Sequence, residues 1–378
     1  MHICFLTSEY PKEGKTQGGV GSFVQTLGRE LVKQGVKVSV IGVASYDKAE
    51  KEDDLGVDIY RIPSSKWRVG KFYENVKHAL SKIKEIDKTN PIDIIEGTEL
   101  LFAFFPKHLG IKKVIRMHGG HNYLAVTLKR KINRWKSFQE KRSFSRADKV
   151  LAVSDFVANT TKELLGLKKP IKTIYNLVDT EKFYQADIAK VRSHKLVCVG
   201  TVMEEKGVRQ LVLALPKVLE KFPDTSLDLI GRDSISKLTK SSYTEYLRSF
   251  IDEKLESHIN ITGPLPHAAI PQRIEEAEVC VYPSHMEAMP IAWLEALGMG
   301  KPVIASQTGP GPEAVEEGKT GLLCDPHNSD DIAEKIIYMF EHPEDAIEMG
   351  NNARKDVLAR FGKDSIIQEN IDFYRSIV

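Results

Sequence analysis

The sequence predicts an α/β protein made of two doubly wound domains, each a parallel sheet covered by helices on both faces. Three observations lead to this prediction. The chain has 378 residues, which is too long for one ordinary hydrophobic core. Short β-branched runs alternate with longer helical stretches, as in parallel sheets with helical crossovers. The alternation stops once, in a polar, turn-rich stretch at residues 176–188, and then restarts.

The first half of the chain contains the clearest helix. Val20, Phe23, Val24 and Leu27 recur at helical spacing, and Gly35 ends the pattern. Strands are expected on both sides of it, at residues 3–7, 36–42, 57–62, 93–96, 113–118, 150–154 and 171–175. We therefore assign residues 1–184 to an N-terminal Rossmann-like domain.

The second half repeats the same plan. Strands are expected at residues 196–199, 227–230, 259–263, 279–283, 302–305 and 321–324, with helices at 208–222 and 290–299 among them. We assign residues 185–363 to a C-terminal Rossmann-like domain. Periodicity alone does not assign the last helix, residues 364–378, to either domain.

Composition limits the classes of protein to consider. The net charge of +2 gives no indication of a nucleic-acid partner, and we expect none. The four cysteines fall in apolar runs without C-x-x-C spacing, which favours buried thiols in a reducing compartment. The apolar run at the start of the sequence is too short for the hydrophobic region of a signal peptide. The longest apolar run, residues 100–105, is too short to span a bilayer. We expect a cytoplasmic protein.

Two nucleotide-binding motifs are ruled out. The tripeptide Gly-Lys-Thr at residues 14–16 and again at 318–320 resembles the end of a phosphate-binding P-loop. The glycine required five positions earlier is replaced by Glu9 and Glu313. A G-x-G-x-x-A match at residues 309–314 lies in the wrong half for a dinucleotide fingerprint. Kinase and dehydrogenase functions lose most of their support.

The stretch Y-P-S-H-M-E-A-M-P-I-A-W-L-E at residues 282–295 is the main candidate site. Glu287 lies on a strand-to-helix loop, the edge where open α/β sheets bind ligands, and Pro290 is expected at the first helical position beside it. Glu287 could hold sugar hydroxyls or steady positive charge at an anomeric carbon. Glu295, further along the helix, could accept ribose hydroxyls. A loop acid and an ordinary helix-surface acid remain the alternatives.

Three further positions also follow strands. Lys206 could neutralise a diphosphate, or it could be a solvated lysine beside acidic neighbours. Gly19, in the first loop, could let a substrate approach the backbone, or it could belong to a plain turn. His118 could hydrogen-bond a sugar hydroxyl or a leaving phosphate, or it could be structural.

Residues 129–149 form a basic segment with interleaved aromatic side chains. Nine basic residues face two acidic ones, and Trp135, Phe138 and Phe144 lie among them. Such a helix could rest on an anionic membrane or receive an anionic acceptor, although a solvated helix face explains it as well. The histidines and acids show no metal-ligand spacing, and no D-x-D triplet occurs, so we expect no metal site.

With these motifs assembled, the chain resembles glycosyltransferase family four, retaining nucleotide-sugar enzymes of the GT-B fold, over nearly its full length. The motif P-S-x-x-E-x-x-P followed by L-E-A at residues 283–296 gives the family's E-x7-E pattern. Further matches are G-x-P-V-I-A-S at 300–306, T-G-L-L at 320–323, V-G-x-V-x-x-E-K-G at 199–207 and A-D-x-V-L-A-V-S at 147–154. The resemblance implies two domains facing across an interdomain cleft, with residues 364–378 crossing back to the first.

The resemblance also implies roles for single residues. Glu287 would contact the transferred sugar, and Glu295 the ribose. Lys206 would hold the diphosphate, and His118 and Gly19 would face the cleft from the first domain. The backbone N–H groups around the start of the helix would assist at Ala288, Met289 and Ile291. One departure bears on the phosphate site: the arginine usually paired with Lys206 is Thr201 here, with Arg209 as a candidate replacement.

The implied function is transfer of a hexose-type sugar from a nucleotide diphosphate donor, with a UDP-sugar favoured over a GDP-sugar. The acceptor would be a hydroxyl of a glycan or of a glycolipid or other lipid-linked acceptor, in cell-envelope polysaccharide synthesis at the inner face of the membrane. No cofactor and no metal would be needed. The alternatives are an inactive nucleotide-sugar-binding subunit and a GT-B epimerase or phosphorylase.

Overall fold

A computed structural model describes residues 1–12, 18–67 and 70–378. The chain divides into two compact units, the first made of Met1–Leu177 with Asp364–Val378 and the second of Val178–Lys363. The boundary precedes the one expected after residue 184 by a short stretch, and the final helix groups with the first unit. The Gly-Lys-Thr tripeptide at residues 14–16 lies outside the described residues.

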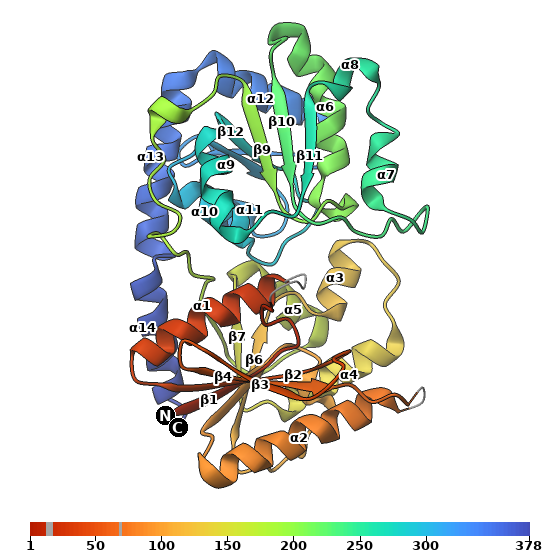
Figure 1. Cartoon of the computed structure of the whole chain (residues 1–378), viewed down its shortest axis with the longest axis vertical. Coiled ribbons are helices and arrows are strands. Elements are labelled where there is room, and N and C mark those ends of the chain that lie inside the picture. Colours follow the sequence, from red (N-terminus) through yellow and green to blue (C-terminus); the bar gives the residue numbers. More distant parts are fainter. Residues whose placement is uncertain (13–17, 68–69) are drawn as a thin grey trace. The chain divides into compact units, whose positions relative to one another are not determined.

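The first unit is built on one sheet. Within the described residues its strand order is β3-β4-β2-β1-β5-β6-β7-β8, and all neighbours are parallel except β3 and β4. Helices α1 and α2 lie on opposite faces of this sheet (Figure 1). The strands are β1 (His2–Leu6), β2 (Lys37–Ala44), β3 (Glu50–Asp54), β4 (Val57–Pro63), β5 (Ile94–Gly97), β6 (Lys112–Met117), β7 (Lys149–Ala152) and β8 (Ile171–Thr173). The helices are α1 (Gly19–Lys33), α2 (Lys71–Thr89), η1 (Leu101–Phe104), α3 (His121–Thr127), α4 (Arg134–Arg146), α5 (Asp155–Leu165) and α14 (Lys363–Arg375).

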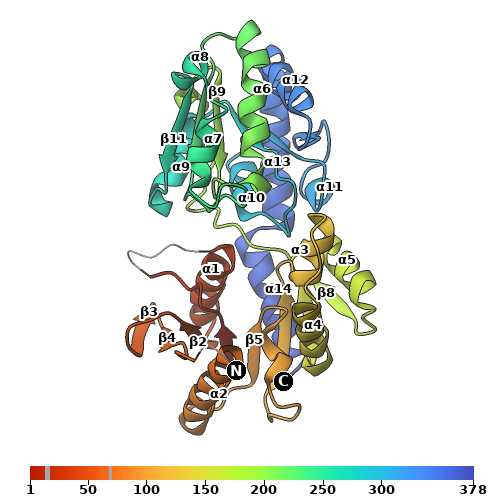
Figure 2. The ribbon, with the colours of Figure 1, turned by 90° about the vertical axis from the view of Figure 1, so that its right-hand side faces the viewer.

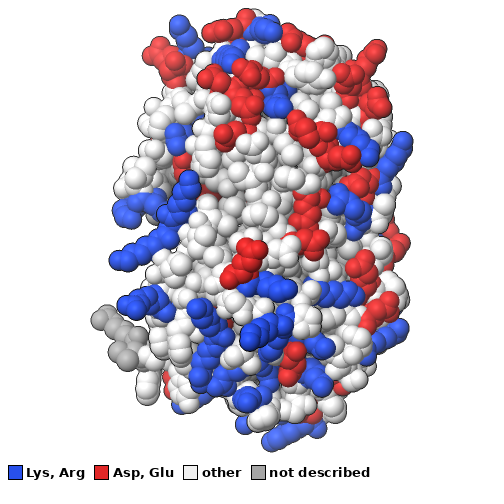
Figure 3. Space-filling view, turned by 180° about the vertical axis from the view of Figure 1, so that it is seen from behind, with Lys and Arg blue, Asp and Glu red and all other residues white. Residues whose placement is uncertain are grey.

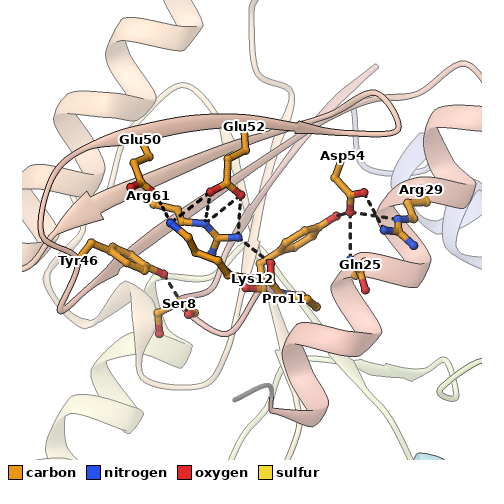
Figure 4. A network of polar contacts seen from close by, with 11 residues as sticks. Ser8, Pro11, Lys12, Gln25, Arg29, Tyr46, Glu50, Glu52, Asp54 and Arg61 are labelled. Carbon is orange, nitrogen blue, oxygen red and sulfur yellow. Dashed lines mark hydrogen bonds and ion pairs between the residues drawn. The ribbon is translucent and has the colours of Figure 1, made fainter. Parts of the chain in front are cut away.

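Strand β3 is absent from the sequence-based expectation. Its residues E-K-E-D-D carry no apolar alternation, because β3 is an edge strand that needs only one hydrogen-bonded neighbour. The buried Arg61 guanidinium on β4 donates to the Glu52 carboxylate of β3 and to the carbonyl oxygens of Tyr10 and Pro11 (Figure 4). Charge pairing therefore joins the two strands of this hairpin, and hydrogen bonds from Arg61 hold it to the segment that follows β1.

The second unit contains a smaller, fully parallel sheet. Within the described residues its strand order is β11-β10-β9-β12-β13-β14. Helices α6 and α12 pack side by side against it (Figure 2). The strands are β9 (Lys195–Val199), β10 (Ser226–Ile230), β11 (Ile259–Gly263), β12 (Val279–Tyr282), β13 (Val303–Ser306) and β14 (Leu322–Cys324). The main helices are α6 (Val208–Lys221), α7 (Tyr243–Arg248), α9 (Ile270–Glu276), α10 (Ile291–Gly298), α12 (Ser329–Glu341) and α13 (Pro343–Arg360).

Both sheets reverse their strand order once. In the second unit the chain moves outward from β9 to β11 and then returns to place β12 on the other side of β9. In the first unit the same reversal separates β1 from β5. These reversals are the switch points at which open α/β sheets bind ligands. The prediction of two doubly wound domains is confirmed. The four cysteines are buried and unpaired, as expected.

Candidate active site

Two loops at the switch point of the second sheet carry the strongest candidate residues. The loop after β9 contains Lys206, within the one-turn helix η3 (Glu204–Lys206), and the loop after β12 contains Glu287. The Nζ of Lys206 donates a hydrogen bond to Oε1 of Glu287. An ammonium and a carboxylate from distant parts of the chain thus meet at the ligand-binding edge of the sheet.

Main-chain contacts hold these two loops together. Gly207 has a φ of 68°, and a Cβ there would lie 1.8 Å from the carbonyl oxygen of Pro283. Only glycine fits this backbone conformation and this close approach without strain. The amide of His285 also donates to the carbonyl oxygen of Glu205 at 2.9 Å. The pairing of Lys206 with Glu287 is therefore supported by the backbone beneath it.

Helix α10 begins directly after the Glu287 loop. Pro290 lies one residue before the helix, with a ψ of 117°, so the expectation of a first helical position is wrong by one residue. No hydrogen bond from a described side chain caps this N-terminus, and its first-turn N–H groups suit an anion. Ala288, Met289 and Ile291 lie in this segment, and their role in donor binding stays a prediction.

Glu295 lies in α10 and is buried, with 7% of its surface exposed. It is therefore not the surface acid that the sequence left open. Burial raises the pKa of its carboxyl group, while the imidazole of His267 opposes this from 3.3 Å. The His267 ring also packs edge-on against Phe183. Sequence patterns do not point to His267, because its contact with Glu295 depends on how η4 (His267–Ala269) packs.

The surroundings of Thr201 differ from the expectation. Arg209 is occupied, because its guanidinium donates to both oxygens of Glu204, at 2.7 to 3.2 Å. Although burial opposes it, hydrogen bonds from Arg209 and Tyr243 hold the pKa of Glu204 at about 2. The cation beside Thr201 is instead Arg232, whose Nε donates to the Thr201 hydroxyl at 3.2 Å. The run G-R-D after an expected strand was the signal that would have found it.

In the first unit, His118 lies just beyond β6 and is half-buried. Its ring packs edge-on against Phe23, and its backbone amide donates to Oε1 of Glu99 at 2.7 Å. Burial, reinforced by the nearby Arg116 guanidinium, lowers the pKa of His118 to about 3. The imidazole is therefore neutral near pH 7 and can exchange hydrogen bonds without carrying charge.

The first loop and a cavity lie at the switch point of the first sheet. Gly19 is exposed at the start of α1, with no atom of the described residues within 4 Å of a Cβ placed there. A cavity of about 360 Å³ opens beside the loop, lined by polar groups such as Ser8 and Thr98 and by apolar groups such as Phe72 and Leu101. This mixed lining suits a ligand with both polar and apolar parts.

The basic segment at residues 129–149 is not one continuous helix, contrary to the expectation. Asn133 caps α4 by accepting from the Lys136 amide at 3.0 Å, and Lys149 already belongs to β7. Phe144 is buried, whereas Trp135 and Phe138 are exposed and stacked with their ring centroids 5.6 Å apart. The amphipathic part of the segment is therefore limited to α4.

Glu99 leads to a prediction about pH. Burial raises its pKa from 4.5 to about 7, so between these values the folded chain holds a proton that the unfolded chain releases. The free energy of unfolding should therefore fall as the pH rises through this range. Glu99→Gln should remove this pH dependence. Between pH 4.5 and pH 8 the free energy of unfolding of the variant should therefore rise relative to that of the wild type, by up to about 3 kcal/mol.

Denaturant unfolding of both proteins at pH 5 and pH 8 measures this difference, with Glu74→Gln, at an exposed ion pair on α2, as the matched control. If the free energies of unfolding of Glu99→Gln and the wild type differed by the same amount at both pH values, the raised pKa of Glu99 would be contradicted.

Comparisons with known proteins agree with this architecture. The model of the family described as Glycosyltransferase Family 4 matches residues 17–182, and that of Glycosyl transferases group 1 matches residues 180–356. A GDP-mannose-dependent α-(1-6)-phosphatidylinositol monomannoside mannosyltransferase of Mycobacterium tuberculosis is 26% identical, with 99% of this chain and 98% of the relative covered.

Solved structures show the same fold. Sucrose-phosphate synthase from Thermosynechococcus elongatus is 20% identical, with a TM-score of 0.83, over 100% of this chain and 99% of the other. Anabaena HepE in complex with UDP and glucose is 19% identical, with a TM-score of 0.79, over 100% of both chains. These likenesses identify the two doubly wound units as those of the GT-B fold.

Proposed function

The chain belongs to glycosyltransferase family four, and from this membership we propose that it transfers a hexose from a UDP-sugar to a hydroxyl of a glycan or glycolipid, with retention at the anomeric carbon. A GDP-sugar is the second candidate donor. The observation that carries the proposal is the pairing of Lys206 with Glu287 at the switch point of the second sheet. HepE, which has been solved with UDP and glucose, supports the first donor, and the GDP-mannose-dependent mannosyltransferase supports the second.

In the proposed reaction the bond between the anomeric carbon and the diphosphate breaks, and the acceptor oxygen bonds to the same carbon. The diphosphate leaves with the bonding electron pair and takes up the proton that the acceptor hydroxyl releases. Lys206 and the N-terminus of α10 stabilise its negative charge, and Glu287 binds the sugar hydroxyls. These roles require the donor to replace the contact that Lys206 and Glu287 make with each other. We propose that these groups suffice without a metal ion, and unchanged turnover after treatment with EDTA would support this.

Two other residues are proposed to act through hydrogen bonds. Glu295 binds the ribose hydroxyls, with the His267 imidazole 3.3 Å from its carboxylate. His118, neutral because of its lowered pKa, contacts a sugar hydroxyl or the leaving phosphate. Gly19, exposed at the start of α1, is proposed to let the substrate approach the backbone. The mixed polar and apolar cavity beside that loop supports an acceptor that carries an apolar part.

A lipid-linked acceptor would bring the protein to a membrane. No helix of the described residues is long and apolar enough to cross one. We propose contact from the cytoplasmic side through an aromatic patch made of Phe72, Phe104, Trp135 and Phe138. Their rings touch in sequence, with centroids 5.6 to 6.1 Å apart. Lysine and arginine side chains also gather over the first unit (Figure 3). Aromatic and basic side chains together suit an anionic bilayer surface.

Cosedimentation with phosphatidylglycerol vesicles tests this contact. Replacing Trp135 and Phe138 by serine should reduce the bound fraction several-fold, because two exposed aromatic groups no longer insert at the interface. Tyr338→Ser, an exposed aromatic residue of the second unit, is the matched control. Equal binding of the double variant and the control would refute the membrane contact.

The transfer itself is tested with a panel of nucleotide sugars. Binding to the native chain should raise its thermal stability for one donor, with UDP-sugars ahead of GDP-sugars. Release of the nucleoside diphosphate should then require a glycan or glycolipid acceptor, and the product should keep the anomeric configuration of the donor. A change in the sugar without an acceptor would indicate an epimerase, and a requirement for inorganic phosphate a phosphorylase. Binding without release in any mixture would indicate an inactive subunit.

A further inference from the structure

We propose that Arg232, at the end of β10, supplies the second positive charge of the diphosphate site, beside Lys206. The inference rests on the proposed nucleotide-sugar donor. It adds a binding residue that neither the sequence motifs nor the comparisons assign. A nucleoside diphosphate carries more than one negative charge, and Lys206 supplies a single ammonium that already faces the carboxylate of Glu287.

The backbone fixes Arg232 at the ligand-binding edge of the second sheet. Strands β9 and β10 are neighbours, and their ends remain paired beyond the sheet, since the amide of Val202 donates to the Arg232 carbonyl at 2.8 Å. Gly231 has a φ of 155°, and a Cβ there would lie 1.8 Å from the carbonyl oxygen of Gly200. This close approach requires glycine and places residue 232 directly beside Thr201.

Arg232 differs from the neighbouring cationic side chains, which pair with carboxylates. Arg209 pairs with Glu204, and Lys237 pairs with Glu205. Within the described part of the chain, Arg232 forms no ion pair, and its side-chain hydrogen bond is the one from Nε to the neutral Thr201 hydroxyl. Even the adjacent carboxylate of Asp233 accepts from Ser234 and Thr244 instead.

A half-buried guanidinium at a sheet edge that forms no ion pair with the described residues is suited to an anionic ligand. Its two terminal nitrogens remain available, and they can donate two parallel hydrogen bonds to phosphate oxygens. The Thr201 hydroxyl holds Nε and so limits the orientations of the planar group. Arg232 and Lys206 thus approach the same sheet edge from the adjacent ends of β10 and β9.

Binding measurements on the full chain test the proposal, using UDP, GDP and the nucleosides uridine and guanosine as probes. Arg232→Ala should lower the affinity for the diphosphate that the wild type prefers, UDP or GDP, by about tenfold to a hundredfold, because a charged hydrogen bond is lost. Binding of the corresponding nucleoside should stay unchanged. Arg232→Lys should lose less than Arg232→Ala. Adding T201R to Arg232→Ala should restore much of the affinity by returning a guanidinium to the same edge.

Arg248→Ala, at an exposed arginine near the end of α7, is the matched control. Diphosphate affinity of Arg232→Ala within twofold of this control would overturn the proposal, as would an equal loss for the diphosphate and its nucleoside. A wild-type chain that binds neither UDP nor GDP would instead overturn the proposed donor class, so the two failures are distinguishable.

Discussion

Replacing Lys206 by alanine is expected to lower kcat/KM for the nucleotide-sugar donor by about a hundredfold to a thousandfold. The ammonium lies at the switch point of the second sheet, where it can meet the diphosphate as negative charge develops on it. The substitution also removes the hydrogen bond from Lys206 to the Glu287 carboxylate, at a site that must accept an anion. Both effects destabilise the transition state, in which charge develops on the diphosphate, more than they weaken donor binding. We therefore expect kcat to fall as well as the affinity for the donor.

Steady-state kinetics with the donor identified by binding measures this loss. Lys206→Arg should retain more activity than Lys206→Ala, because it keeps the charge but changes its geometry. Lys217→Ala is the matched control, since Lys217 pairs with Asp330 and Glu334 on α12, away from the strand ends. If Lys206→Ala and Lys217→Ala had kcat/KM values within threefold of each other, the assignment of Lys206 to the diphosphate would be wrong.

Periodicity predicted the two sheets well, because their buried strands are short apolar runs separated by amphipathic helices. The run at residues 196–199 and the helix expected at 208–222 correspond to β9 and to α6, Val208–Lys221. The loop containing Lys206 lies between them, so its place at a strand end followed from the pattern. The same reasoning placed Glu287 after β12.

What the pattern could not predict depends on pairing between distant segments. Lys206 and Glu287 are separated by 81 positions, and only the packing of their two loops brings them together. Arg232 was missed because its significance comes from having no carboxylate partner among the described residues, which a sequence does not reveal. Strand β3 was missed because an edge strand with a charged face has no apolar period.

The buried polar cluster around Arg116 is a second feature of this kind. The Arg116 guanidinium on β6 donates to Glu96 of β5 at 2.7 Å and to Asn370 of α14 at 2.6 Å. The hydroxyl of Tyr374 accepts from Arg116 at 3.1 Å and donates to Glu96 at 2.8 Å. All four side chains are buried. Helix α14, from the far end of the chain, is thereby joined to the first sheet.

Arg116→Met is therefore expected to destabilise the first unit by about 3–5 kcal/mol, because the Glu96 carboxylate would remain buried without its cation. Replacing Glu96 by glutamine in the same chain should recover part of this loss, since the uncompensated charge is then removed. Hydrogen exchange of the β5 and β6 amides measures the stability of the first unit alone. A single global unfolding midpoint would combine the stabilities of the two units. Arg134→Met, at an exposed residue of α4, is the matched control. A loss below about 1 kcal/mol, or none recovered by the Glu96 substitution, would show that the buried Arg116–Glu96 pair does not stabilise the first unit.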